Sequence, residues 1–355
     1  MQQERWSFME MIRAEGLSKT FRVARRRPGL LGSIRSVVDP EVRKVQAVYD
    51  LSLSVERGEM IGLVGPNGAG KSTTIKMLTG ILVPSSGEMS VAGLNPLRQR
   101  RELASHIGVV FGQRSQLWWD LPLIDSLRLL RHLYRVPEAR FTTNLAQLRS
   151  MLALDEFIDT PVRQLSLGQR MRGDLAAALL HDPELVYLDE PTIGLDVVAK
   201  ARIREFLLTI NADRGVTVLL TTHDMDDVEA LCQRMLIVDH GRKLYDGSVG
   251  DIRERFGGER TLVAVLDPVE LATAPHDAEG QPMIVDLPGG VHLLRAEEPR
   301  IWLGFSRDAI PAHELVAWLV ARYNLRDVTF QEPEIEDVIR RIYEEGLLLQ
   351  EAGIV

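Results

Sequence analysis

Residues 60–74 read MIGLVGPNGAGKSTT, and this stretch decides the fold. The apolar run at 60–64 is typical of a buried strand, and a helical pattern begins at about residue 74. The glycines between them have no Cβ, so the backbone N–H groups of the loop can turn inward around an anion. The spacing G-x-x-x-x-G-K-S predicts a phosphate loop, in which Lys71 reaches the β- and γ-phosphates and the Ser72 hydroxyl lies on Mg²⁺. A nucleoside triphosphate is therefore the expected ligand.

The composition is that of an ordinary globular chain. Of its 355 residues, 45% are hydrophobic and 26% are charged, and the length suffices for two or three domains. The formal net charge of −8 argues against nucleic-acid binding through bulk electrostatics. Cys232 is the single cysteine, which excludes an internal disulfide and favours a reducing compartment. No apolar run approaches the ~18 residues of a membrane span, and the N-terminus lacks the apolar core of a signal peptide. We therefore expect a cytoplasmic protein whose membrane contact goes through a partner.

Strand-like apolar runs alternate with helical patterns over residues 9–255, which predicts an α/β core with parallel strands. From about residue 256 the pattern changes to short strands, among them 283–287, with turns between them. Helices are expected at 311–323 and 334–345. We therefore expect a small α+β domain at 256–355.

Two segments interrupt the core pattern. Residues 114–182 predict a helical subdomain, because leucines recur at helical spacing from 123 to about 151. Residues 22–46 form a basic insertion, whose prolines and glycines predict a loop or a short added helix. A solvated surface loop is the simpler interpretation of these charges, and contact with acidic lipid headgroups or an acidic partner face is the alternative.

Polar side chains follow several of the expected strands. Asp189 and Glu190 end a buried strand, at the edge where α/β sheets place their ligands. Asp189 is expected to hold Mg²⁺ through water, and Glu190 to polarise the attacking water. Gln113 follows another buried strand and can touch both the metal ion and a water. His223 follows a third strand and can bridge to a γ-phosphate, although a lone histidine there is more often structural.

Two further turns carry candidate residues. Ser166, Gly168 and Gln169 stand at the start of a helix, where backbone N–H groups and a hydroxyl are available to an anion. Taken alone, Ser166 is simply a preferred capping residue. The turn that ends in Asp196 follows Glu190 closely and adds one carboxylate.

The order of these motifs resembles the nucleotide-binding subunit of an ATP-binding-cassette (ABC) transporter, over about residues 9–245. The resemblance implies a P-loop NTPase core with a helical signature subdomain, ATP and Mg²⁺ as cofactors, and ATP hydrolysis. It also implies a head-to-tail dimer, in which ATP lies between the phosphate loop of one subunit and the Ser166 turn of the other. It assigns catalysis to Glu190, His223 and Gln113, and the metal ion to Ser72, Gln113 and Asp189. It assigns nucleotide binding to Phe21, Asn67, Gly68, Ala69, Gly70, Lys71, Ser72, Thr73, Ser166, Gly168, Gln169 and Asp196.

The sequence departs from the family pattern at two places. Leu167 replaces the commoner glycine of the signature, whereas Ser166 and Gly168, which are expected to approach the phosphate, are present. The aromatic residue that stacks on adenine is expected at Phe21, directly before the basic insertion, and Tyr49, just after it, is the alternative.

Two stretches bear on what the ATPase drives. Residues 332–339 resemble the C-terminal motif of exporter-type subunits, which pair with six-helix ABC-2 permeases and include drug and antibiotic efflux ATPases. The helical subdomain is where the family docks its membrane partners, and Trp118 and Trp119 lie near its start. For this pair we expect either one buried and one exposed ring or two core rings. The resemblance therefore implies export of a drug-like or lipid-like molecule by a homodimer or heterodimer at the cytoplasmic face of the membrane.

An importer subunit is the nearest alternative. Importers often carry a small β-barrel tail, and the helices expected at the end of this chain argue against one. A non-transport ABC ATPase is the other. The single phosphate loop and the lack of sustained heptads argue against the two-cassette proteins of translation and the coiled-coil chromosome proteins. Glu190 and His223 together argue against a non-hydrolysing regulatory cassette.

Overall fold

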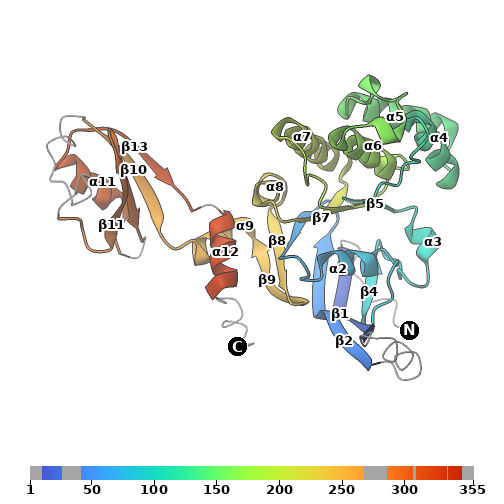
Figure 1. Ribbon diagram of the computed structural model, residues 1–355, viewed down its shortest axis with the longest axis horizontal. Helices are drawn as coiled ribbons and strands as arrows, with labels where there is room; N and C mark the ends of the chain where they lie inside the picture. The colour runs from blue at the N-terminus through green and yellow to red at the C-terminus, as the bar shows by residue number, and fades with distance from the viewer. Residues whose placement is uncertain are drawn as a thin grey trace, which may run out of the picture. The chain divides into compact units, whose positions relative to one another are not determined.

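The computed structural model in Figure 1 describes residues 10–25, 41–112, 114–267, 286–306, 309–333 and 335–345. The chain divides into two compact units, Met1–Val249 and Gly250–Val355. Among the described residues, no helix is long and apolar enough to cross a membrane. Sheets and helices occur in both units, and the predicted mixed α/β fold is confirmed.

A six-stranded sheet forms the centre of the first unit, in the order β5-β6-β7-β3-β8-β9. The first five strands pair in parallel, and β9 pairs antiparallel with β8. The strands are β3 (Met60–Val64), β5 (Ile107–Phe111), β6 (Leu185–Asp189), β7 (Thr217–Thr222), β8 (Arg234–Asp239) and β9 (Arg242–Ser248). Because parallel strands share one direction, the residues that follow β3, β5, β6 and β7 meet at one edge of the sheet.

A second sheet, in the order β2-β1-β4, is antiparallel. It consists of β1 (Glu10–Arg25), β2 (Glu41–Glu56) and β4 (Ser86–Val91). One apolar cluster contains buried residues from this sheet, from the central sheet and from helix α2 (Lys71–Leu78). The shared core therefore fixes α2, and with it the phosphate loop, between the two sheets.

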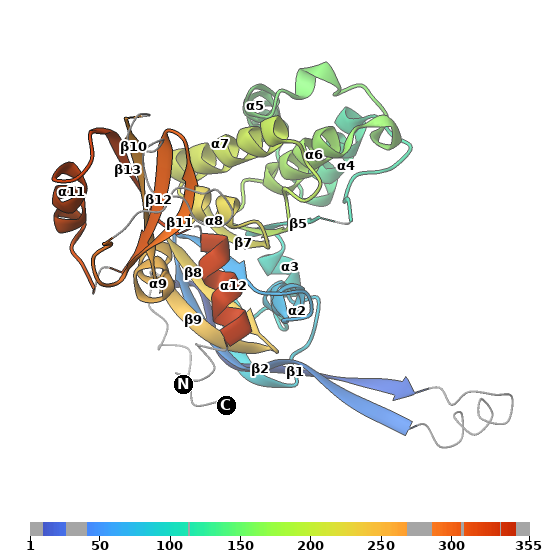
Figure 2. The same ribbon diagram turned by 60° about the vertical axis from the view of Figure 1, so that its left-hand side comes forward.

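The hairpin of β1 and β2 extends well past β4 (Figure 2). Its pairing continues from Phe21 opposite Val45 to Arg25 opposite Glu41. The prediction of a loop or short helix over 22–46 is therefore wrong at both ends, and residues 26–40 lie outside the described residues. The prolines and glycines behind that prediction all fall within 26–40, whereas β-branched residues such as Val23 favour a strand.

The helical subdomain contains several short helices. α4 (Leu123–Leu133) and α5 (Glu138–Met151) are separated at Pro137, which has no N–H to continue a helix. α6 (Leu167–Leu179) follows two short 3-10 turns, Leu154–Glu156 and Val162–Gln164. The other described helices of the first unit are α3 (Arg100–Leu103), α7 (Val197–Arg214) and α8 (Met225–Leu231).

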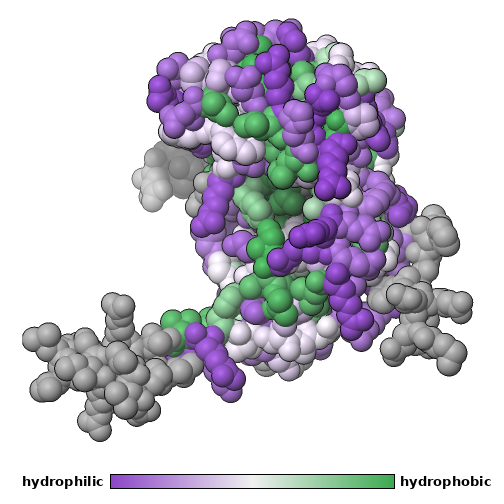
Figure 3. All heavy atoms as spheres, turned by 90° about the vertical axis from the view of Figure 1, so that its right-hand side faces the viewer, coloured by the Kyte–Doolittle hydropathy of each residue, from purple (hydrophilic) through white to green (hydrophobic). Residues whose placement is uncertain are grey.

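Trp118 and Trp119 are both exposed, by 41% and 54%. The two expected arrangements, with one or both rings in the core, are therefore wrong. Figure 3 shows the side of the molecule that carries α3 and α4, where apolar side chains surround a hollow between polar ones. Exposed apolar side chains that gather on one surface are common at protein–protein contacts.

The second unit contains a four-stranded antiparallel sheet in the order β11-β12-β10-β13. One face of the sheet packs with α11 (Ala312–Val320) around a separate apolar core. Its other elements are α9 (Val249–Phe256), β10 (Arg260–Leu266), β11 (Val291–Glu297), β12 (Arg300–Phe305), β13 (Leu325–Gln331) and α12 (Ile335–Glu345). Of the strand predicted at 283–287, residues 283–285 lie outside the described residues, and Asp286 and Leu287 are not in a strand.

A chain that ends at Val249 is expected to fold by itself, because the apolar cluster around α2 lies entirely before this residue. Thermal unfolding of the truncated chain should be cooperative, with a midpoint within ~5 °C of the corresponding transition of the full chain. Circular dichroism and calorimetry measure both transitions. An aggregated or non-cooperative product would show that the first unit needs the second.

Candidate functional site

The phosphate loop joins β3 to α2 in a conformation suited to an anion. Gly68 and Gly70 have φ angles of 86° and 104°, in the left-handed region that glycine tolerates. A Cβ at Gly70 would lie 2.5 Å from the carbonyl oxygen of Ala47, so β2 leaves no room for a side chain there. α2 begins at Lys71, and its first N–H groups therefore border the loop.

Lys71 curls back over the loop that precedes it. Its Nζ donates hydrogen bonds to the carbonyl oxygens of Gly65, at 2.5 Å, and Pro66, at 3.2 Å. Burial lowers the pKa of Lys71, and the charges of Glu190 and Asp189 oppose that shift. The two carboxylates therefore favour the charged ammonium group that a phosphate ligand requires.

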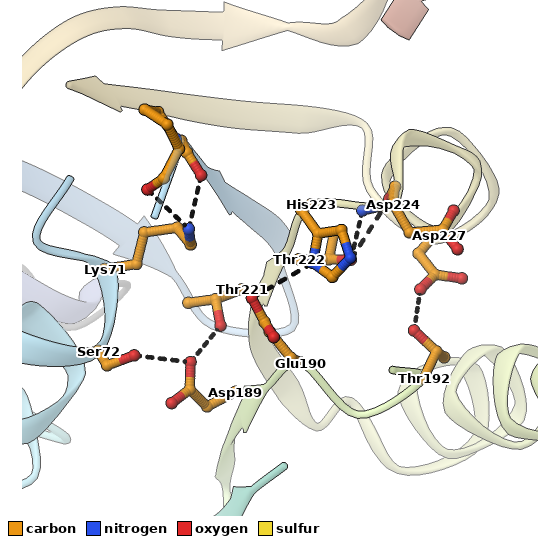
Figure 4. A network of polar contacts seen from close by, with 12 residues as sticks. Lys71, Ser72, Asp189, Glu190, Thr192, Thr221, Thr222, His223, Asp224 and Asp227 are labelled. Atoms are coloured by element: carbon orange, nitrogen blue, oxygen red, sulfur yellow. Dashed lines mark hydrogen bonds and ion pairs between the residues drawn. The ribbon is translucent and has the colours of Figure 1, made fainter. Parts of the chain in front are cut away.

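Asp189 joins three elements at the carboxyl edge of the central sheet (Figure 4). Its Oδ1 accepts a hydrogen bond from Ser72 Oγ of α2, at 3.2 Å, and another from Thr221 Oγ1 of β7, at 2.5 Å. The motifs predict Ser72 and Asp189 but not Thr221. The available signal was the two threonines that follow the apolar run at 218–220, because a hydroxyl in such a buried strand requires a partner.

Glu190 has a backbone conformation that is rare for a residue with a side chain, with φ at 55°. Its N–H donates to the carbonyl oxygen of Thr221 at 2.9 Å. Its Oε1 lies 3.3 Å from Nδ1 of His223, which follows β7 (Figure 4). The two predicted catalytic residues are therefore in contact because β6 and β7 are neighbours in the sheet.

Gly112 lets β5 approach the Asp189–Glu190 peptide closely. Its N–H donates to the carbonyl oxygen of Asp189 at 2.7 Å. A Cβ at this position would lie 2.7 Å from that oxygen and 2.8 Å from the carbonyl oxygen of Glu190, so any side chain would displace them. Gln113, the predicted ligand that comes next, lies outside the described residues.

A cavity of about 440 Å³ opens between the phosphate loop and the ends of β5 and β6. It brings together four predicted residues, Asn67 and Ser72 from the phosphate loop and the start of α2, and Asp189 and Glu190 from the end of β6. The lining residues are Asn67, Ser72, Lys76, Ile81, Phe111, Gly112, Arg114, Asp189 and Glu190.

A second cavity, of about 580 Å³, gathers the predicted residues of the two turns. Its lining residues are Ser166, Leu167, Gly168, Gln169, Arg172, Gly194, Leu195, Asp196, Val198, Ala199 and Arg202. The Ser166 hydroxyl accepts from the Gln169 N–H, and the Gln169 side chain accepts from the Ser166 N–H, a capping box at the start of α6. Asp196 caps α7 by accepting from the Ala199 N–H at 2.8 Å. The phosphate loop contributes no residue to this cavity, so the predicted nucleotide residues form two separate groups within one chain.

The two aromatic candidates are both partly exposed and line neither of these cavities. The Arg242 guanidinium lies 3.9 Å from the ring centre of Tyr49 and covers one face. The Lys19 ammonium lies 5.3 Å from the ring centre of Phe21, and the Phe21 ring is therefore the less closely covered of the two.

Comparison with known proteins identifies the family. A family model described as "ABC transporter" matches residues 48–193. The ABC transporter ATP-binding protein NatA of Bacillus subtilis (strain 168) is 32% identical over 210 residues, which are 59% of this chain and 85% of NatA. The chain belongs to the ABC transporter family. It is an ATP-binding subunit and an ATP hydrolase of this family, as the motifs predict.

Two further proteins illustrate how far this ABC transporter ATPase resembles known ones. The Nod factor export ATP-binding protein I of Cupriavidus pinatubonensis is 38% identical over 220 residues, which are 60% of this chain and 67% of that protein. A solved structure, described as the ATP binding subunit of an ABC transporter, has a TM-score of 0.58 and 28% identity, and the match covers 70% of this chain and 93% of that one.

Asp174 of α6 supports the segment that follows Gln113. Its Oδ1 accepts from the Ser115 hydroxyl at 2.8 Å and from the Gln116 N–H at 3.1 Å. Burial raises the pKa of Asp174 to about 6, although these hydrogen bonds lower it. The carboxyl group is therefore half protonated at a mildly acidic pH.

Asp174→Asn is expected to change how stability depends on pH. The pKa in the folded state lies above the ordinary value of 3.8, so folding favours the protonated acid. The ABC transporter ATPase should therefore lose stability relative to the variant as pH rises from about 4 to about 6. At about 1.4 kcal/mol per pH unit, the loss amounts to ~3 kcal/mol. Urea unfolding of both proteins at pH 4.5, 5.5 and 7 measures this loss of stability. If the difference in unfolding free energy between the two proteins stays constant over these pH values, the raised pKa of Asp174 is refuted.

Proposed function

We propose that this ATPase powers the export of a small molecule through ABC-2 type permease subunits. It acts as a dimer that binds two ATP molecules at composite sites and hydrolyses them with Glu190 as general base. The observation that carries the proposal is the separation of the predicted nucleotide residues into two cavities of one chain.

The phosphates of ATP lie in the loop formed by Asn67, Gly68, Ala69, Gly70, Lys71, Ser72 and Thr73. The N–H groups of the loop and the first turn of α2 supply donors and the positive end of the helix dipole. Lys71 exchanges its bonds to Gly65 and Pro66 for the β- and γ-phosphates. Phe21 stacks on adenine, since Arg242 already covers one face of the alternative, Tyr49.

Ser72, Asp189 and Gln113 hold Mg²⁺. The fit rests on the 3.2 Å between Ser72 Oγ and Asp189 Oδ1, which lets both oxygens face one ion, directly or through water. Within the described ranges, no three His, Cys, Asp or Glu side chains converge as a metal site. That suits Mg²⁺, which usually takes one or two carboxylates together with phosphate oxygens and water. When bound, the ion neutralises charge on the phosphates.

Glu190 accepts the proton of the attacking water, and His223 holds the Glu190 carboxylate in place. Nδ1 of His223 lies 3.3 Å from Glu190 Oε1 and donates to this carboxylate. Nε2 donates to a γ-phosphate oxygen when the imidazole ring carries a proton on both nitrogens. Gln113, which follows β5 in the chain, orients the same water.

The second subunit supplies Ser166, Gly168 and Gln169 to the γ-phosphate, together with Asp196. The start of α6 presents its N–H groups to this anion, as a helix N-terminus does. Two identical chains, or two related ones, then close head to tail around two ATP molecules. ATP favours the closed state and hydrolysis releases it, which supplies the mechanical step.

Export is the favoured direction because the similar protein from Cupriavidus pinatubonensis is named for Nod factor export, and because residues 332–339 resemble an exporter motif. The exposed Trp118 and Trp119 suit a permease docking surface, since tryptophan is enriched at binding hot spots. The ATPase then lies at the cytoplasmic face of the membrane, attached through its permease. An importer ATPase or a non-transport ATPase is the alternative.

Glu190→Gln is expected to bind ATP normally and to hydrolyse it roughly 10²–10⁴-fold more slowly, because the general base is lost. Because the bound ATP is not hydrolysed, dimers should accumulate. Analytical ultracentrifugation in the presence of ATP and Mg²⁺ measures them. Lys71→Ala is the matched control, and it should lose ATP binding and therefore remain monomeric. Turnover near the wild-type rate in Glu190→Gln would remove Glu190 from its proposed role.

Co-expression with a permease tests whether the ATPase is attached to the membrane through this partner. One or two adjacent genes for proteins with six hydrophobic spans are expected, and a neighbouring periplasmic binding protein would instead favour import. With the permease present, the ATPase should sediment with the membrane fraction, and without it the ATPase should stay in the supernatant. Membrane sedimentation without any permease would contradict attachment through a partner.

A further inference from the structure

A buried carboxylate that lines neither cavity belongs to α8, the helix that follows the proposed catalytic residue His223. Asp227 of α8 is fully buried, and it accepts a hydrogen bond from the hydroxyl of Thr192 (Figure 4). It also accepts a hydrogen bond from Arg204 Nε of α7, at 2.5 Å. Thr192 is itself 2% exposed. Arg204 keeps 23% of its side chain exposed, and together the two donors hold the carboxylate of Asp227 in one orientation.

A second carboxylate extends the cluster toward His223. Asp224 forms an ion pair with Lys200 of α7, and Arg204 lies 3.7 Å from it. The N–H of Asp224 donates to the Thr222 hydroxyl at 2.9 Å. Lys200 and Arg204 stand one turn apart on α7, so this helix binds two carboxylates, Asp224 and Asp227, of the segment after β7.

The cluster connects the two segments that carry the catalytic residues. Thr192 lies two residues after Glu190 and four before Asp196, which caps α7. Asp224 directly follows His223, and Asp227 lies in the first turn of α8. The bonds from Thr192 and Arg204 therefore span from the turn after Glu190 to the helix after His223.

Stability alone is a weak reason for this arrangement. Burying an ion pair carries a desolvation penalty that can exceed its attraction, and apolar residues of similar volume often serve as well or better. A charged, hydrogen-bonded cluster does something that apolar packing does not, because it sets the distance and orientation of the segments that it joins.

We propose that Asp227 is a positioning residue for ATP hydrolysis. Through Thr192 and Arg204 it holds the turn after Glu190 against the segment after His223, so that Nδ1 of His223 and Oε1 of Glu190 stay in contact. This rests on the proposed roles of Glu190 and His223.

Thr192→Val tests the proposal, because valine keeps the shape of threonine and removes the hydroxyl. Its kcat for ATP hydrolysis is expected to fall ~10–100-fold, as small misplacements of catalytic groups do. Its KM and its affinity for ATP should stay within about twofold, since the phosphate loop is untouched. Thr192→Ser restores the donor and should return kcat to within about threefold of the wild-type value.

Thr217→Val is the matched control. Thr217 is also fully buried, and its hydroxyl accepts from the Gly58 N–H at 2.9 Å. It lies at the first residue of β7, whereas His223 follows the last residue of this strand. This variant should lose stability in thermal unfolding without a change in kcat. An equal loss of kcat in Thr217→Val, an unchanged kcat in Thr192→Val, or a failure of serine to restore activity would each overturn the proposal.

A combined variant separates this proposal from the proposed function. In a Glu190→Gln background, Thr192→Val should slow the residual hydrolysis no further, because the hydroxyl acts through Glu190. A further loss of about tenfold would show that the cluster acts elsewhere. If Glu190→Gln alone hydrolyses ATP at the wild-type rate, the proposed role of Glu190 fails. The comparison of Thr192→Val with Thr192→Ser and Thr217→Val is made in a chain that keeps Glu190, so its outcome is distinct from that failure.

Discussion

Two hydroxyl groups meet at one carboxylate oxygen of Asp189, and the rest of the site depends on this contact. Ser72 reaches the oxygen from α2 and Thr221 reaches it from β7. A half-buried carboxylate without such donors would be costly, so α2, β6 and β7 are held together at the carboxyl edge of the sheet. Glu190 is the next residue, and its N–H bonds to the carbonyl oxygen of the same Thr221. The nucleotide loop and the proposed general base therefore share a single anchor.

The sequence predicts the parts of this site that are local. The phosphate loop and the Asp189–Glu190 pair each lie within a few consecutive residues whose pattern has a direct physical meaning. The sequence does not predict the roles of Thr221, Gly112 and Asp227, because these roles come from the strand order β5-β6-β7, which brings together residues far apart in the chain. The hairpin arms at 22–25 and 41–46 were mistaken for a loop because the prolines and glycines between them dominated the local pattern. The exposed Trp118 and Trp119 were equally unpredictable, since packing decides burial.

The surface proposed to meet the second subunit is already ordered within one chain. Ser166 and Gln169 cap α6 reciprocally, and Asp196 caps α7. Side chains fixed in this way lose little further freedom when a partner arrives, so association costs less conformational entropy. The buried cluster around Asp227 extends the same rigidity from the turn before Asp196 to the segment after His223. A closing dimer would therefore move whole segments instead of reordering individual side chains.

The left-handed backbone of Glu190 has an evolutionary consequence. A non-glycine residue in that region costs about 1 kcal/mol or more relative to glycine, which adopts it freely. Glycine at this position would relax the turn, yet it would remove the carboxylate that faces His223. Selection for a more stable fold and selection for turnover therefore act in opposite directions on one codon, and an inactive descendant of this chain would be free to become the more stable protein.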